Sequence, residues 1–205
     1  MTNQKLHSKR TVLTHVLYLH GFRSSPQSFK ARTLAAWLAE QAPALHWWCP
    51  QLPASPAAAW ALVRDGTDDW PVAGMAVVGS SLGGFYATCM AEQRRCVALL
   101  LNPAVDPARD LARHVGVQSQ YHAPEQLFEF LPGYLDELRA MTPAAITRPE
   151  RYSAIIAKGD ELLDWREMSG RYPGANIRLL DGSDHALADF EDHLDFVAEF
   201  LGLVG

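Results

Sequence analysis

The feature that most restricts the fold is an apolar run that leads directly into a serine flanked by glycines. The run Met75-Ala76-Val77-Val78 is followed by Gly79-Ser80-Ser81-Leu82-Gly83 and then by a helical stretch. The pattern G-x-S-x-G in this setting predicts a strand that turns abruptly into a helix, because a Cβ at Gly79 or Gly83 would crowd the turn. Such a turn strains the backbone of the central serine and exposes its hydroxyl. Ser81 is therefore the candidate nucleophile, and Ser80 is its structural neighbour.

Short β-rich runs alternate with longer helical stretches along the whole chain, as in βαβ units that build a parallel sheet. Most of the runs are nearly continuous in apolar residues, as expected of strands buried on both faces. The sequence therefore predicts an α/β fold, with a mostly parallel sheet of about six strands and helices on both faces. The expected strands cover residues 12–19, 45–49, 74–79, 96–101, 152–157 and 177–180.

The helical stretches also carry start and break signals. Ser25-Pro26 fits an N-cap followed by a proline at the first helical position, and a last helix is expected over residues 186–201. Residues 103–149 show only helices and loops, including a helical stretch over 125–141 with a break at Pro132-Gly133. In a parallel-sheet protein, an insertion that follows the carboxyl end of a strand is expected to lie over the edge of the sheet where active sites are found. We expect one domain over residues 1–205, with a small helical insertion at about 103–149.

Composition excludes several classes of protein. With 205 residues, of which 48% are hydrophobic, the chain can bury a sizeable core. Its formal net charge of -5 provides no basic field for phosphate backbones, so no nucleic-acid partner is expected. No apolar run approaches the roughly 18–20 residues that span a bilayer. Residues 1–10 are expected to be a mobile tail and not a signal peptide, because His15 interrupts the apolar run that follows them and no small-residue cleavage site appears.

Three cysteines are an odd number, and their spacing does not fit a metal site. We expect a reduced, cytoplasmic protein. The sequence also contains no His-Glu-x-x-His motif, no G-x-G-x-x-G motif and no G-x-x-x-x-G-K-[ST] motif. No metal and no cofactor are therefore expected.

A serine hydroxyl needs a base, and His185 is the best placed histidine. It follows the expected strand 177–180 in a loop just before the last helix, whereas His193 falls within that helix and His114 and His122 fall in the insertion. In hydrolases with a strand–serine–helix turn, the order along the chain is serine, acid, histidine. The sequence therefore predicts His185 as the base.

The acid has two candidates in one loop. Asp160 follows the expected strand 152–157 in a Lys-Gly-Asp turn, and Asp164 comes four residues later. Asp164-Trp165-Arg166-Glu167 also reads as a helix N-cap with Glu at the third position, which is a sufficient structural role. Asp160 is therefore the preferred acid, and Asp164 remains the alternative.

Two backbone amides are expected to stabilise an oxyanion. One is the N–H of Leu82, directly after the serine, and the other is the N–H of Phe22, in the loop after the first strand. His20, in the same loop, is expected to be a hydrogen-bonded structural residue. Residues that can line an apolar acyl pocket, or equally belong to the core, are Phe22, Tyr86, Leu162, Leu163 and Leu187.

Several blocks of this sequence resemble, in order, the YqiA-type family of small bacterial α/β-hydrolases, over about residues 14–202. The resemblance implies a compact, lid-poor α/β-hydrolase fold, hydrolysis of esters or thioesters, and a triad of Ser81, Asp160 and His185. The matching blocks are Tyr18-Leu19-His20-Gly21-Phe22, Ser24-Ser25-Pro26 with Ser28, Gly79-Ser80-Ser81-Leu82-Gly83-Gly84-Phe85-Tyr86-Ala87-Thr88, Leu101-Asn102-Pro103-Ala104-Val105, Gly159-Asp160-Glu161 and Asp184-His185.

Together these features predict a carboxylesterase-type serine hydrolase that acts on a small-molecule ester. An acyl-CoA-type thioesterase is the alternative within the enzyme class. A hydrolase fold repurposed for binding is the alternative outside it. The oligomeric state is left open.

Overall fold

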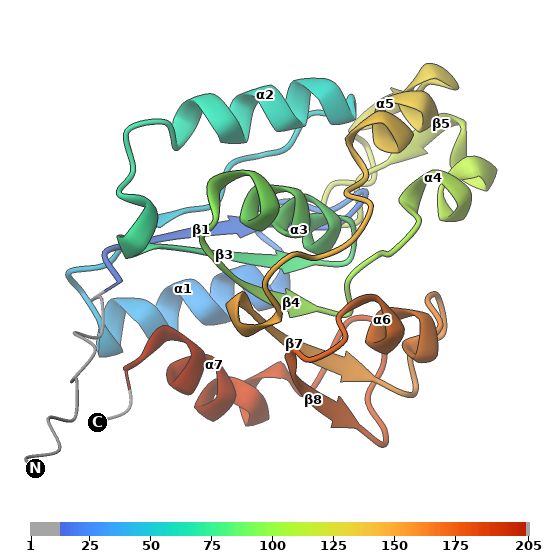
Figure 1. Cartoon of the computed structure of the whole chain (residues 1–205). Coiled ribbons are helices and arrows are strands. Elements are labelled where there is room, and N and C mark those ends of the chain that lie inside the picture. The colour runs from blue at the N-terminus through green and yellow to red at the C-terminus, as the bar shows by residue number, and fades with distance from the viewer. Residues whose placement is uncertain (1–12, 204–205) are drawn as a thin grey trace, which may run out of the picture.

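A six-stranded parallel sheet runs through the centre of the molecule, with helices on both faces (Figure 1). The structure is a computed structural model that describes residues 13–203, so the tail expected over residues 1–10 lies outside the described part. The strand order is β2-β1-β3-β4-β7-β8, and every neighbouring pair is parallel. The strands are β1 (His15–Leu19), β2 (His46–Trp48), β3 (Met75–Ser80), β4 (Val97–Leu101), β7 (Tyr152–Ala157) and β8 (Asn176–Leu180). The predicted α/β architecture and its six strands are confirmed, with small differences at the strand ends.

Alternate side chains of each strand enter two separate cores, as the period of two requires. Leu17 and Leu19 of β1 point into the core beneath α2 (Pro56–Gly66), α3 (Leu82–Arg94) and α6 (Trp165–Arg171). Val16 and Tyr18 point into the core beneath α1 (Phe29–Gln41) and α7 (Leu194–Leu201). Four short 3-10 helices connect these elements: Val72–Gly74, Ala112–His114, Pro149–Arg151 and Phe190–His193.

The sequence predicted only helices and loops between β4 and β7, but this insertion also contains two strands. It contains α4 (Pro107–Asp110), an antiparallel hairpin of β5 (Gly116–Ser119) and β6 (Leu127–Phe130), and α5 (Gly133–Met141). The helix expected over 125–141 therefore covers only its second half. Phe128 and Phe130 alternate with exposed neighbours and pack against the Phe22 ring, so tertiary contact favours the strand. Figure 1 shows the insertion beyond the carboxyl ends of the strands, at the edge where it was expected.

Two helix boundaries also differ from the prediction. Ser25 does not cap α1, because Ser25-Pro26 forms a turn in which the Ser25 Oγ accepts the Gln27 N–H, and the helix begins at Phe29 after the N-cap Ser28. The helix expected over 186–201 is divided into a turn, the 3-10 helix Phe190–His193 and α7. Leu187 has a φ of +50°, which interrupts a regular helix at that point.

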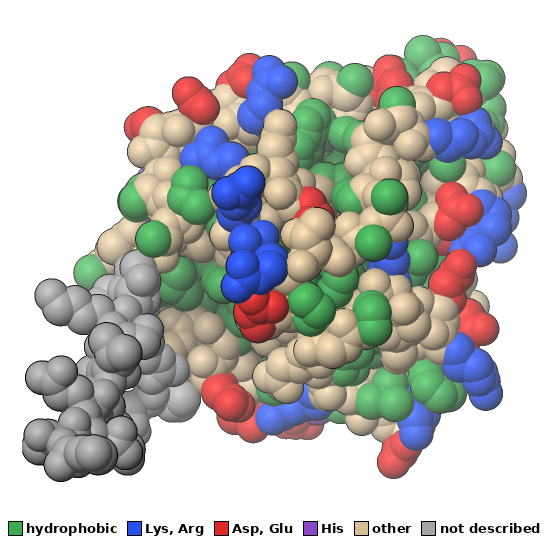
Figure 2. Space-filling view, viewed as in Figure 1, with side chains coloured by type: hydrophobic (Ala, Val, Ile, Leu, Met, Phe, Trp, Pro, Cys, Tyr) green, Lys and Arg blue, Asp and Glu red, His purple; other side chains and the backbone are tan. Residues whose placement is uncertain are grey.

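Basic and acidic side chains are interspersed over the face of the molecule shown in Figure 2. Among residues 13–203, no helix combines the length and the apolar character needed to cross a bilayer.

Candidate active site

Ser81 lies between β3 and α3 in a strained backbone conformation, with φ 55° and ψ −120°. Three N–H groups, from Gly84, Phe85 and Ala104, donate to its carbonyl oxygen, and its own N–H donates to Leu101 on β4. A strained backbone persists only where the surrounding structure holds it, and these four hydrogen bonds hold the turn that exposes the Ser81 side chain. The helix α3 starts at the next residue, so its N-terminus lies directly against the serine.

The glycines around Ser81 are required by close contacts. A Cβ on Gly83 would overlap the carbonyl of Leu19 on β1, and a Cβ on Gly79 would overlap the carbonyl of Gly83. Both obstacles are backbone atoms, so neither contact can be relieved by rotating a side chain. The helix therefore packs against the strands only when glycine stands at these two positions.

We expect Gly83→Ala to lower the free energy of unfolding by about 3 kcal/mol or more, because the main chain of β1 or α3 must shift. Gly170→Ala, near the end of α6, is the matched control, since nothing lies within 4 Å of its added Cβ. That substitution should be neutral or stabilise the protein by up to about 1 kcal/mol. Urea denaturation of both variants measures the difference. Equal stability would contradict the close packing at Gly83.

Ser81, His185 and Asp160 form a continuous chain of hydrogen bonds, although they come from three different loops. The Ser81 Oγ lies 3.0 Å from His185 Nε2, and His185 Nδ1 lies 2.7 Å from Asp160 Oδ2. The Asp160 side chain is fully buried and the His185 side chain is 17% exposed. In the tautomer that donates its Nδ1 proton to Asp160, His185 presents a lone pair at Nε2 to the serine.

The structure separates the two aspartates of the β7–α6 loop. Asp160 Oδ1 accepts the N–H groups of Leu162 and Leu163, each at 2.8 Å, which fixes the carboxylate toward His185. Asp164 is instead the N-cap of α6, where its Oδ1 accepts the Arg166 N–H at 2.9 Å. Only Asp160 contacts the histidine.

Two residues that the sequence analysis did not assign hold the His185 loop. Asn102, at the end of β4, is fully buried, and its amide donates to the Asp184 and His185 carbonyls at 3.0 and 3.3 Å. The Glu161 carboxylate accepts the His185 N–H at 3.0 Å. Asn102 has a φ of +43°, a conformation that asparagine tolerates better than most residues do. An asparagine directly after a strand is therefore the local sequence feature that fits this position.

The expected amide donors lie beside the serine. Leu82 is the first residue of α3, and Phe22 follows Gly21, where an added Cβ would lie 3.2 Å from the Ser81 Cβ. Within residues 13–203, neither the Leu82 N–H nor the Phe22 N–H donates a hydrogen bond. His20 is buried, with Nδ1 3.0 Å from the Gly21 carbonyl and Nε2 accepting from Leu52, and burial lowers its pKa. It therefore shapes this loop as a neutral structural residue.

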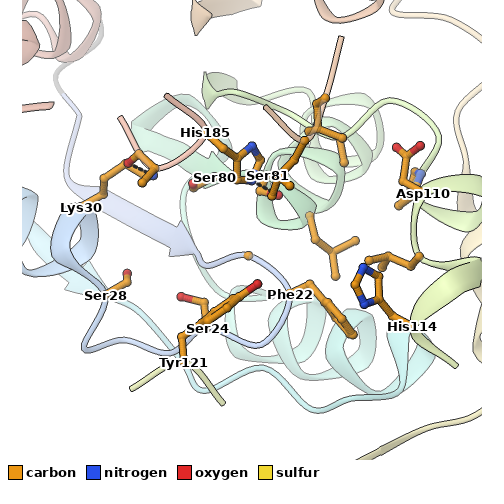
Figure 3. Close-up of a pocket in the computed structure, with 18 of the residues that line it drawn as sticks. Phe22, Ser24, Ser28, Lys30, Ser80, Ser81, Asp110, His114, Tyr121 and His185 are labelled. Atoms are coloured by element: carbon orange, nitrogen blue, oxygen red, sulfur yellow. Dashed lines mark hydrogen bonds between the residues drawn. The ribbon is translucent and has the colours of Figure 1, made fainter. Parts of the chain in front are cut away.

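A cavity of about 290 Å³ opens at Ser81 and His185 (Figure 3). Phe22, Leu162 and Leu163 line it, as expected of acyl-pocket residues. Tyr86 lines a separate cavity of about 220 Å³ on the other side of Phe22 and Leu82. Leu187 belongs to the core and not to the pocket, the second of the two alternatives, because its side chain is fully buried beneath α1 and α7.

The cavity also contains polar groups that the sequence did not indicate. Ser28, the N-cap of α1, and Lys30 in its first turn lie at one end, and Asp110 and His114 from the insertion lie at the other (Figure 3). They were missed because the chain folds them over the serine from remote segments. In the part of the chain that the structure describes, no cluster of His, Cys, Asp or Glu is arranged to hold a metal ion.

Solved structures with this fold come from organisms that are far apart. Alpha/beta hydrolase domain-containing protein 10 from mouse is 15% identical, over 91% of this chain and 90% of that chain, with a TM-score of 0.66. The esterase Pf2001 from Pyrococcus furiosus is 16% identical, over 94% and 82%, with a TM-score of 0.63. The carboxylesterase CesB from Bacillus subtilis is 16% identical, over 92% and 84%, with a TM-score of 0.58. The chain therefore has the α/β-hydrolase fold.

The sequence matches a family model more directly. The model describes the uncharacterised protein family UPF0227 and covers residues 15–202, nearly the whole chain. The match spans the Ser81 turn, both aspartates of the β7–α6 loop and His185. The chain belongs to family UPF0227, the YqiA family that its sequence blocks resemble.

Proposed function

We propose that this protein is a serine hydrolase that cleaves carboxylic esters of small or medium acyl groups. The observation that carries the proposal is the hydrogen-bonded chain from Ser81 Oγ through His185 to the buried Asp160, at the edge of a largely apolar cavity. A serine within 3.0 Å of a histidine that a carboxylate orients is the arrangement that activates a hydroxyl for acyl transfer. Two of the structural neighbours named above are esterases, in agreement with this class.

In the proposed reaction, Ser81 Oγ attacks the ester carbonyl carbon while His185 Nε2 takes the hydroxyl proton. The tetrahedral oxyanion receives hydrogen bonds from the N–H groups of Phe22 and Leu82, and the N-terminal end of α3 adds a favourable field. When the carbon–oxygen bond to the alcohol breaks, His185 returns the proton to the leaving oxygen. Water then attacks the acyl-enzyme, again with His185 as base, and releases the carboxylic acid and free Ser81.

Asp160 has a supporting role in this scheme. Its carboxylate holds His185 in the tautomer that accepts at Nε2, and it stabilises the imidazolium that forms when the serine proton moves. It does not itself take the proton. The full burial of its side chain strengthens this interaction, since the local dielectric is low.

A fluorophosphonate probe tests the proposed class without knowledge of the natural substrate. The probe should attach covalently to Ser81, and peptide mass spectrometry should locate it there. Ser81→Ala should abolish labelling. A folded wild-type protein that resists the probe would favour a binding role. For a labelled enzyme, a graded series of 4-nitrophenyl esters and acyl-CoAs would decide between ester and thioester preference.

A further inference from the structure

One end of the cavity contains hydrogen-bond donors that other groups among residues 13–203 satisfy only in part. We call it the α1 recess and define it as Tyr18, Ser28 and Lys30, all of which line the cavity at Ser81 and His185. The Tyr18 side chain is fully buried, and its hydroxyl lies near the Ser28 and Ser80 hydroxyls without a hydrogen bond of normal length and angle within the described residues. The Ser28 Oγ is also buried, and no hydrogen bond to it is found among residues 13–203. Buried hydroxyls without well-formed hydrogen bonds are costly, so a ligand group that bonds to one of them would stabilise the recess.

Ser28 stands where a serine side chain normally forms a hydrogen bond with the helix that follows it. Ser28 is the N-cap of the 13-residue helix α1, where a serine Oγ ordinarily accepts an N–H of the first turn. Here it makes no such bond, and the first turn contains no acidic residue. The N-terminal end of α1 therefore presents an uncompensated positive potential at the recess. Because no hydrogen bond holds the Ser28 side chain, it can rotate toward a ligand in the cavity.

Lys30 adds a full positive charge beside His185. Its Nζ donates to the carbonyl of Ala186, the residue after His185, and its other two N–H groups make no hydrogen bond within residues 13–203 (Figure 3). No carboxylate of the described chain lies within salt-bridge distance of Nζ. Burial lowers the pKa of Lys30 to about 8, against the opposing effect of Asp184 and Asp160. An ammonium held in this way lacks a close anionic partner.

The opposite end of the cavity contains a carboxylate. Asp110 lies there, across from Lys30 (Figure 3), and its Oδ2 is buried without a hydrogen-bond partner. Burial raises the pKa of Asp110, so its environment already disfavours negative charge. Arg109 pairs with the Asp110 Oδ1 at 2.8 Å, and Arg113 also lines the cavity. The charge of Asp110 is thus partly balanced, whereas Lys30 has no carboxylate within salt-bridge distance in the described residues.

We propose that the α1 recess binds a carboxylate of the substrate, so that the enzyme prefers esters that carry a free carboxylate near the scissile bond. Lys30 provides the charge and the Ser28 hydroxyl donates a hydrogen bond. This inference rests on the proposed esterase function. The carboxylate can belong to the acyl part of the ester, as in a monoester of a dicarboxylic acid, or to the alcohol part, as in an ester of a hydroxy acid.

Two matched pairs of esters test this preference. Monoethyl glutarate and ethyl pentanoate differ by a carboxylate on the acyl side, and 3-acetoxypropanoate and propyl acetate differ by one on the alcohol side. For each pair, the ratio of kcat/KM for the charged ester to kcat/KM for the neutral ester measures recognition of the carboxylate. We expect a ratio above about 10 for one pair in the wild-type enzyme, the gain of one well-placed charged hydrogen bond. The pair that shows it identifies the side of the ester.

Substitutions then assign the preference to the recess. Lys30→Met retains the length of the stem but removes the charge, and it should lower the ratio at least tenfold. Ser28→Ala should lower the ratio by about threefold, since a neutral donor contributes less than a charged one. Arg32→Met is the matched control, because it removes an equal charge from an exposed position on the same helix. A ratio near 1 for both pairs in the wild-type enzyme, or equal ratios in Lys30→Met and Arg32→Met, would overturn the proposal.

The pH dependence of the wild-type ratio needs no variant. The carboxylates of Asp184 and Asp160 act on the charge of Lys30, and the His185 imidazole and the Tyr18 phenol line the same cavity. Changes in the catalytic groups affect both esters of a pair and cancel in the ratio. Because Lys30 loses its proton as the pH rises through its pKa of about 8, the ratio should be highest near pH 7 and fall as the pH rises to about 9. A constant ratio up to pH 9 would contradict the role of Lys30.

Failure of this proposal is distinguishable from failure of the proposed function. If Ser81→Ala loses all ester hydrolysis but Lys30→Met has the same charged-to-neutral ratio as the wild type, the esterase assignment stands and the recess does not bind carboxylates. If Ser81→Ala retains hydrolysis of all four esters, both proposals are wrong.

Discussion

Ser81→Ala should eliminate ester hydrolysis and leave the fold intact. Removal of the serine nucleophile alone lowered kcat by about 10⁶ in a well-studied serine protease, and we expect a loss of at least about 10⁴ here. Stability should change little, because alanine has the same Cβ as serine and the strained backbone is held by main-chain hydrogen bonds. Initial rates with 4-nitrophenyl butyrate and a thermal unfolding curve measure the two quantities.

Ser80→Ala is the control for Ser81→Ala. Ser80 is the last residue of β3, it is largely buried, and it makes no hydrogen bond to His185. Its replacement should retain activity within about tenfold of the wild type. If Ser80→Ala were inactive and Ser81→Ala active, the nucleophile would be the neighbouring serine and the proposed mechanism would be wrong.

Asp160→Asn should lower kcat by about 10⁴, and the hydrogen bonds explain why. Asp160 Oδ1 accepts the N–H groups of Leu162 and Leu163, and the amide oxygen of asparagine takes over both bonds. The NH₂ group then faces His185 Nδ1 and donates to it. The histidine must move its proton to Nε2, where it can no longer accept the Ser81 proton. The wrong tautomer cost a factor of about 10⁴ at the equivalent position of a serine protease triad.

Asp164→Asn is the matched substitution four residues along the chain. Asparagine caps a helix nearly as well as aspartate does, so α6 should be retained. The ion pair of Asp164 with Arg166, at 3.7 Å, is exposed and contributes little. The kcat of Asp164→Asn should therefore stay within about tenfold of the wild type. Steady-state rates of both variants decide the question, and a large loss at Asp164 with none at Asp160 would reassign the acid.

The sequence by itself determined the Ser81 turn and the α/β sheet. Both follow from local requirements: only glycine fits at Gly79 and Gly83, and a strand buried on both faces is apolar along its whole length. The hairpin β5–β6 was missed because its alternation is short and its strand character comes from packing of Phe128 and Phe130 on Phe22. The local pattern at 125–141 is compatible with a helix until that contact exists.

The sequence predicted only part of the candidate site. Chain order predicted Ser81, a loop aspartate and His185, but the choice of Asp160 over Asp164 needed the contact with His185 at 2.7 Å. The serine and its two partners follow β3, β7 and β8, and the sheet order β3-β4-β7-β8 brings their loops to one edge.

Tertiary structure alone brought charged groups from distant segments into the cavity. Lys30 lies on α1 and Asp110 in α4, 80 positions apart along the chain, and nothing in either local sequence indicates that they line one cavity. The physical reason is that a turn or a buried strand is selected by its own residues and nearest neighbours. The surroundings of a side chain are instead set by how distant elements pack, and that packing is decided by the sheet order and the two cores as a whole.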